Sequence, residues 1–129
     1  MKKIVTSMMV MSVLSMSLYG YSQADRVKDM QVMETAMAQI QKGILSNDDK
    51  MVVEGVDNLK KATANVEVAP KWKMDYSPSY AKQQTENILT YADKIKSSIG
   101  ENRKHSASKS YTKILNECIS CHNKLRRWK

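Results

Sequence analysis

The sequence has few of the residues that break a helix: its 129 residues include two prolines and four glycines. Strict alternation of apolar and polar residues, which marks a half-buried strand, is almost absent. Phenylalanine is missing, whereas methionine occurs ten times, so methionine must supply part of any hydrophobic core. These absences argue against a β-rich fold and favour an all-α fold.

Cysteine and histidine are also scarce, with two residues of each in the chain. Both cysteines fall in the run C-I-S-C-H at 118–122, and His105 is the only histidine outside it. A structural zinc site needs about four such ligands, so a zinc site is not favoured. A redox dithiol of the thioredoxin type opens a helix after a strand, and no strand-rich stretch precedes this run. A dithiol redox enzyme without a cofactor stays as the alternative from a different class.

The spacing of the two cysteines and the following histidine is that of a c-type haem attachment site. Each thiol adds to one vinyl group of the same porphyrin, so both sulfurs must face one side of a helical turn. Positions i, i+3 and i+4 of a helix share a face, which puts Cys118, Cys121 and His122 on one side. We predict one covalently bound haem c, with His122 as an axial ligand of its iron.

The only long apolar run lies near the N-terminus, at 4–18, and it follows two lysines. It is shorter than the ~20 residues that a membrane-spanning helix needs. Small residues follow it, and the layout is that of a secretory signal peptide. We expect cleavage after Ser22 or Ala24; an uncleaved N-terminal anchor is the alternative. The expected organisation is a leader, 1–24, and one mature domain, 25–129, exported to a bacterial periplasm.

Acidic residues are outnumbered: 13 Asp and Glu stand against 21 Lys and Arg, giving a formal net charge of +8. Loss of the leader with its two lysines leaves +6. A basic surface favours encounter with acidic partners and makes association depend on salt. We therefore expect acidic redox partner proteins. Nucleic acid is not expected as a partner, since the chain carries an export signal and no recognised nucleic-acid-binding motif.

Apolar residues recur at helical spacing in four segments, which predicts helices at 25–45, 48–66, 79–99 and 106–128. Asn47 is expected to cap the second helix at its start. Short connections join the first and the last pair of helices, and a longer one joins the two pairs. This pattern predicts an antiparallel up-down-up-down four-helix bundle.

The haem motif continues the apolar stripe of the last predicted helix. That stripe contains Ala107, Tyr111, Ile114, Cys118 and Cys121. We therefore expect both cysteines and His122 to face the interior of the bundle. In the third helix the inward-facing stripe begins with a polar residue, Gln84.

A second axial ligand would come from the start of the first helix, which in such a bundle lies level with the end of the last. Three methionines at helical spacing lie there: Met30, Met33 and Met37. We expect Met30 to bind the iron and the other two to pack in the core. A thioether ligand favours ferrous haem and suits electron transfer. If Met30 does not bind, the alternative is a high-spin protein that binds nitric oxide or another small gas. His105 is expected at the opposite end of the bundle from His122.

Two parts of the chain resemble the cytochrome c′ family, the class II c-type cytochromes. The ending from Cys118 to Arg126 is similar to the family's C-terminal motif, and Arg26 followed four residues later by Met30 is similar to its first helix. The resemblance implies a low-spin member of the cytochrome c556 type, in which Arg26 pairs with a haem propionate and Arg126 packs near the proximal face. The start of the mature chain also resembles cytochrome b562, a bundle of the same architecture. The family often dimerises through its first two helices, so a homodimer stays open. No nucleophile, general base or substrate pocket is implied, and no enzyme activity is expected.

Overall fold

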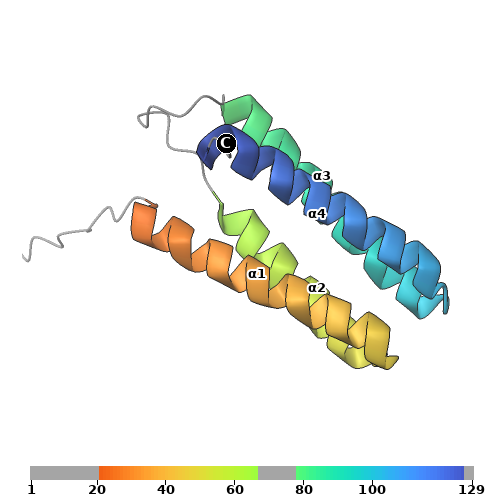
Figure 1. Cartoon of the computed structure of the whole chain (residues 1–129). Coiled ribbons are helices and arrows are strands. Elements are labelled where there is room, and N and C mark those ends of the chain that lie inside the picture. The colour runs from red at the N-terminus through yellow and green to blue at the C-terminus, as the bar shows by residue number, and fades with distance from the viewer. Residues whose placement is uncertain (1–20, 67–77, 127–129) are drawn as a thin grey trace, which may run out of the picture.

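The computed structural model describes residues 21–66 and 78–126, except for the side chains of Pro78, Leu125 and Arg126 (Figure 1). Within these ranges the chain is all-helical and contains no strand. The four helices are α1 (Gln23–Ser46), α2 (Asp49–Asn65), α3 (Pro78–Gly100) and α4 (Lys104–Arg126). The prediction of an all-α fold with four helices is confirmed. The leader at 1–20 and the connection at 67–77 lie outside the described residues.

Each helix packs against the next one along the chain, and α4 also contacts α1. Figure 1 shows α1 and α2 as one antiparallel pair and α3 and α4 as a second pair beside it. Successive helices run in opposite directions, so the arrangement is an up-down-up-down four-helix bundle. None of the described helices is long and apolar enough to cross a membrane.

The helix ends differ from expectation by a few residues, and one cap was predicted wrongly. Asn47 does not cap α2; it ends α1 in the left-handed conformation with φ 61°, and its N–H donates to the carbonyl of Gly43. Asp48 is the cap of α2, because its carboxylate accepts the N–H of Met51 at 2.9 Å. The connection between α1 and α2 is so short that one residue must end the first helix and the next must begin the second. Asparagine tolerates the left-handed conformation better than most residues.

α1 begins two residues before the predicted start of the mature domain. Ser22 caps it, and its hydroxyl accepts the N–H of Asp25 at 3.1 Å. The carboxylate of Asp25 accepts the N–H of Ser22 at 2.8 Å, which completes a capping box. Either expected cleavage position would remove Ser22 and with it this cap.

The core fills the bundle away from the end that carries His122. Its fully buried side chains come from all four helices: Ile40, Val52, Val56, Leu59, Ile95 and Ile114. α1 and α2 approach closely at Gly55, where a Cβ atom would lie 2.8 Å from Cγ1 of Ile40. The close approach explains a glycine in the middle of a helix, where it otherwise weakens the helix by ~1 kcal/mol relative to alanine.

Candidate functional site

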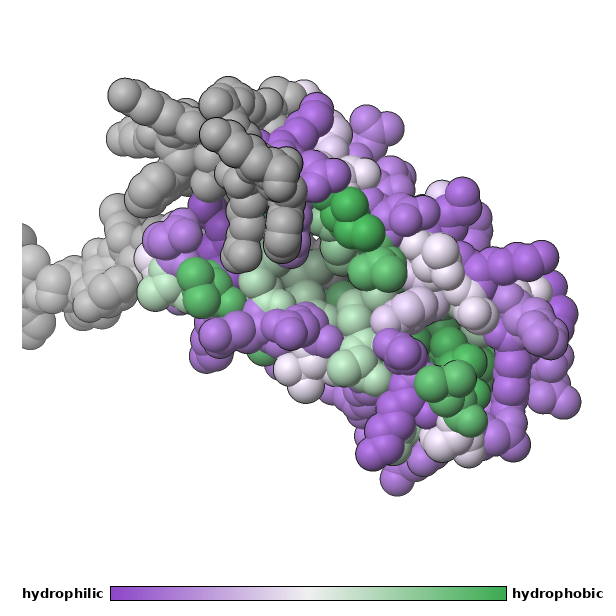
Figure 2. All heavy atoms as spheres, viewed as in Figure 1, coloured by the Kyte–Doolittle hydropathy of each residue, from purple (hydrophilic) through white to green (hydrophobic). Residues whose placement is uncertain are grey.

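A cavity of about 380 Å³ opens between α1, α3 and α4, near the end of the bundle where α1 begins and α4 ends. Figure 2 shows hydrophobic side chains gathered around a hollow on this face of the molecule. Its volume lies in the range of typical small-molecule and cofactor sites. The apolar lining comes from Met30, Met33, Met37, Ala38, Val66, Ala81, Ile88, Leu115 and Ile119.

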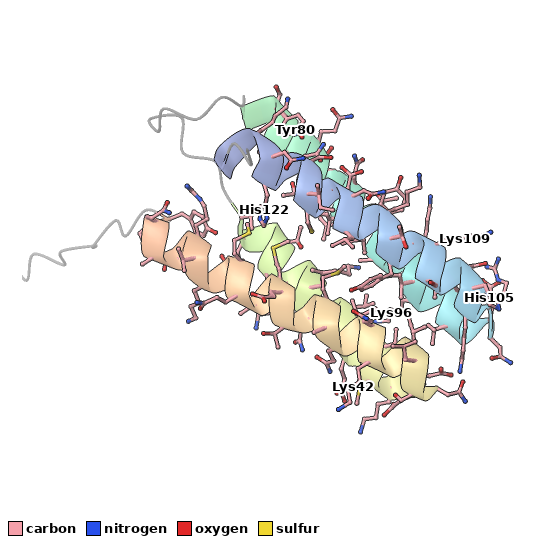
Figure 3. The ribbon with its side chains drawn as sticks, viewed as in Figure 1. Lys42, Tyr80, Lys96, His105, Lys109 and His122 are labelled. Atoms are coloured by element: carbon pink, nitrogen blue, oxygen red, sulfur yellow. The ribbon has the colours of Figure 1, made fainter. Side chains whose placement is uncertain are left out.

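α4 contributes the whole of the predicted attachment motif to this cavity. Cys118, Cys121 and His122 all line it, and all three are half-buried. Figure 3 shows His122 in the space between α4 and α1. Ile119, in contrast, is 48% exposed at the rim. The one-sided placement expected from the i, i+3, i+4 spacing is thus present in the fold.

α1 contributes the three methionines, and it faces α4 in an antiparallel register that one hydrogen bond fixes. The hydroxyl of Tyr111 donates to Oε1 of Gln41 at 3.1 Å. In antiparallel helices, equal steps back along one and forward along the other stay level. Eleven steps from this pair lead from Gln41 to Met30 and from Tyr111 to His122. The structure therefore brings Met30 level with His122 across one cavity.

Met33 and Met37 also line the cavity, but they are more deeply buried than Met30. Met33 is 7% exposed and Met37 is 8% exposed, and both belong to the hydrophobic core. Met30 is half-buried and packs against the edge of that core. The expectation that Met33 and Met37 pack in the core is confirmed. Of the three methionines, Met30 is the one that the core does not enclose.

α3 closes the third wall, and its register with α4 is fixed twice. Nδ2 of Asn87 donates to Oε2 of Glu117 at 3.3 Å, and Nζ of Lys124 lies 3.8 Å from the ring centre of Tyr80. Both contacts put Gln84 level with Ser120, inside the turn that carries the motif. Oε1 of Gln84 is buried and has no hydrogen-bond partner among the described residues. The sequence signal for this buried acceptor was a polar residue, Gln84, at the first position of an otherwise mostly apolar helix face.

Arg26 is buried in the wall of the cavity, with 7% of its surface exposed. Its Nη1 donates to Oε1 of Gln23 at 3.2 Å, and its guanidinium lies 5.8 Å from the ring centre of Tyr21. A largely desolvated cation at the edge of an apolar cavity attracts a bound anion. The side chain of Arg126, the other predicted basic residue, lies outside the described residues.

The thiols of the motif are not activated. Burial, together with the neighbouring Cys121, raises the pKa of Cys118 to about 11. Burial also raises the pKa of Cys121, although Lys124 opposes the shift. Catalytic dithiols have a lowered pKa, because the thiolate is the reactive species. The environment of this pair therefore disfavours a dithiol redox enzyme.

The other histidine, His105, lies far from the cavity. Figure 3 places His105 and His122 at opposite ends of α4, as expected. His105 is exposed in the first turn of that helix. No group of three or more His, Cys, Asp or Glu side chains within 21–66 and 78–124 could hold a metal ion.

The residues around the cavity fit a c-type haem. Two thiols and an imidazole line one wall, a thioether lies level with the imidazole on the opposite wall, and a buried guanidinium stands beside them. The rest of the lining is mostly apolar, as a porphyrin ring requires. No protein-family model, curated protein or solved structure matches this chain.

Proposed function

We propose that the protein is a monohaem c-type cytochrome that carries electrons, with the fold and ligands of a low-spin cytochrome c′ relative. Cys118 and Cys121 would hold haem c through thioethers, and His122 and Met30 would ligate its iron. One observation carries the proposal: the attachment motif of α4 and Met30 of α1 face the same apolar cavity at the same level.

Haem, when bound, takes up and gives up one electron at its iron. The methionine and aliphatic lining would exclude water, which favours the less charged, reduced form. Met30 would favour it further, because a thioether is a weak donor to ferric iron. Arg26 would balance the charge of a propionate. Neither thiol of the cavity wall is an activated nucleophile, since both are half-buried and have raised pKa values, so no enzyme activity is proposed.

The expected leader and the net charge bear on where the protein would act and on its partners. Haem c is attached outside the cytoplasm, so the leader at 1–24 would deliver the chain to the periplasm, where cleavage would leave a net charge of +6. Such a surface would suit acidic redox proteins, and electron exchange with them should slow as salt is added. A rate that did not depend on salt would argue against acidic partners.

The ligand assignment is tested by a matched pair of variants, Met30→Leu and Met33→Leu. Leucine conserves the volume of methionine, so both variants should fold with a loss below about 1.5 kcal/mol. Met30→Leu should convert the oxidised protein from low spin to high spin, because leucine has no ligating atom. Met33→Leu should stay low spin. Visible absorption of the periplasmically expressed proteins reads both outcomes.

Two results would overturn the assignment. An unchanged low-spin spectrum in Met30→Leu would show that another group occupies the sixth position. A wild-type protein with broad high-spin bands that change when nitric oxide is added would support the gas-binding alternative instead.

A further inference from the structure

Gln84 is a polar side chain of the cavity wall whose acceptor the fold leaves unused. Its carboxamide oxygen is buried without a hydrogen-bond partner among the described residues. Burying an unsatisfied acceptor is costly, since the group loses its hydrogen bonds to water and gains none. Such an atom in a cavity wall indicates a donor that comes within reach of it only when the cavity is filled.

The helix register says which part of the site this acceptor lies beside. Gln84 is level with Ser120 of α4, according to both the Asn87–Glu117 and the Tyr80–Lys124 contacts. Ser120 lies between the two cysteines of the motif, and His122 follows two residues later. Gln84 and His122 line the same cavity. The acceptor therefore lies beside the turn that presents the imidazole.

A histidine that ligates iron through one ring nitrogen carries a proton on the other, and that N–H needs an acceptor. Three other described polar side chains of this wall are less suited to accept that N–H. Oε1 of Gln41 already accepts from Tyr111, and the hydroxyl of Thr85 is directed to the carbonyl of Lys82 at 2.8 Å. Glu34 is exposed on α1, the helix of the opposite wall.

We propose that Gln84 is the positioning residue for the axial histidine: its Oε1 accepts the hydrogen bond of the His122 Nδ1–H once haem is attached. The proposal rests on the proposed function. The bond would fix the plane of the imidazole and make it a stronger electron donor to the iron. A stronger donor stabilises ferric iron and lowers the reduction potential.

The test compares three variants of the haem-loaded protein: Gln84→Leu, Gln84→Glu and Gln83→Leu. Gln83 is the adjacent residue on the exposed side of α3 and is the matched control. Gln84→Leu should raise the midpoint potential, with the reduction equilibrium changing by up to about tenfold, which is 59 mV for a one-electron couple. Gln84→Glu should lower the potential, because a carboxylate is the stronger acceptor. Gln83→Leu should leave it unchanged.

A spectroscopic signature separates this role from a merely structural one. In a Met30→Leu background, the ferrous iron–histidine stretching frequency should fall in Gln84→Leu and rise in Gln84→Glu. Potentials of Gln84→Leu and Gln83→Leu that agree would overturn the proposal, as would shifts of the same sign in both Gln84 variants. If Gln84→Leu loads no haem, the shift of Gln84→Glu relative to Gln83→Leu decides. A wild-type chain without haem would instead refute the proposed function, so the two failures are distinguishable.

Discussion

The reactivity of the Cys118 and Cys121 thiols depends on their position in the cavity wall, where α4 places them. Both thiols are half-buried, and desolvation favours their neutral form. The sequence alone left a haem site and a reactive dithiol both open. Burial of the pair against apolar neighbours disfavours the reactive dithiol, because the thiolate is the reactive species.

This burial predicts the pH dependence of thiol alkylation in the chain produced without haem attachment. Only the thiolate reacts, and the pKa of Cys118 is raised to about 11. The rate at Cys118 should therefore be well below that of a free thiol at neutral pH and should keep rising as the pH approaches 11. Mass spectrometry of iodoacetamide-treated protein, with the urea-denatured chain as the control, measures the two rates. A rate at Cys118 that levels off below about pH 8 would restore the dithiol interpretation.

For other single residues, the sequence predicted the position or role to different degrees. The position of Met30 level with the motif was predictable, since the antiparallel topology puts the start of the first helix beside the end of the last. Asn47 was not, because a good N-cap residue is also a good left-handed residue, and only the length of the connection decides between the two roles. For Arg26 the resemblance implied a haem propionate as partner but gave no burial; the structure leaves only 7% of its surface exposed.

Helix packing depends on small residues at the crossing of α1 and α2. Besides its contact with Cγ1 of Ile40, a Cβ at Gly55 would lie 3.1 Å from the backbone nitrogen of Ile40. Backbone atoms cannot move aside as a flexible side chain can. Only the structure shows that Gly55 lets another helix approach and that this helix is α1.

Gly55→Ala should therefore destabilise the protein by about 1–3 kcal/mol, although alanine is the better helix former. Urea unfolding measures the change. Gly100→Ala is the control: no atom lies within 4 Å of the added Cβ, and the φ of this glycine is not positive. This variant should be neutral or up to ~1 kcal/mol more stable. Equal effects at both positions would show that the α1–α2 approach is looser than described.

At the level of elements, periodicity predicted which segments are helices, and caps decided where they end. The predicted starts and ends miss the observed ones by one or two residues, as at the starts of α1 and α4. The register between helices was beyond the sequence. It depends on contacts between residues far apart in the chain, such as Tyr111 with Gln41.

For the whole molecule, the shortage of proline, glycine and strand-forming patterns was enough to predict an all-α bundle. The cavity was not predictable, because a cavity is a volume that several helices leave unfilled together. Its position is central to the proposed function: the haem would lie where the bundle opens around Cys118, Cys121, His122 and Met30, at the opposite end from the core.

The most direct test of that claim is the visible absorption spectrum of the exported wild-type protein, oxidised and then reduced. We expect sharp low-spin bands in both states, with the weak red band of methionine-to-iron bonding in the oxidised protein only. A colourless, folded protein from a host that attaches haem c would contradict the claim outright. Broad high-spin bands would keep the haem and remove Met30 as its ligand.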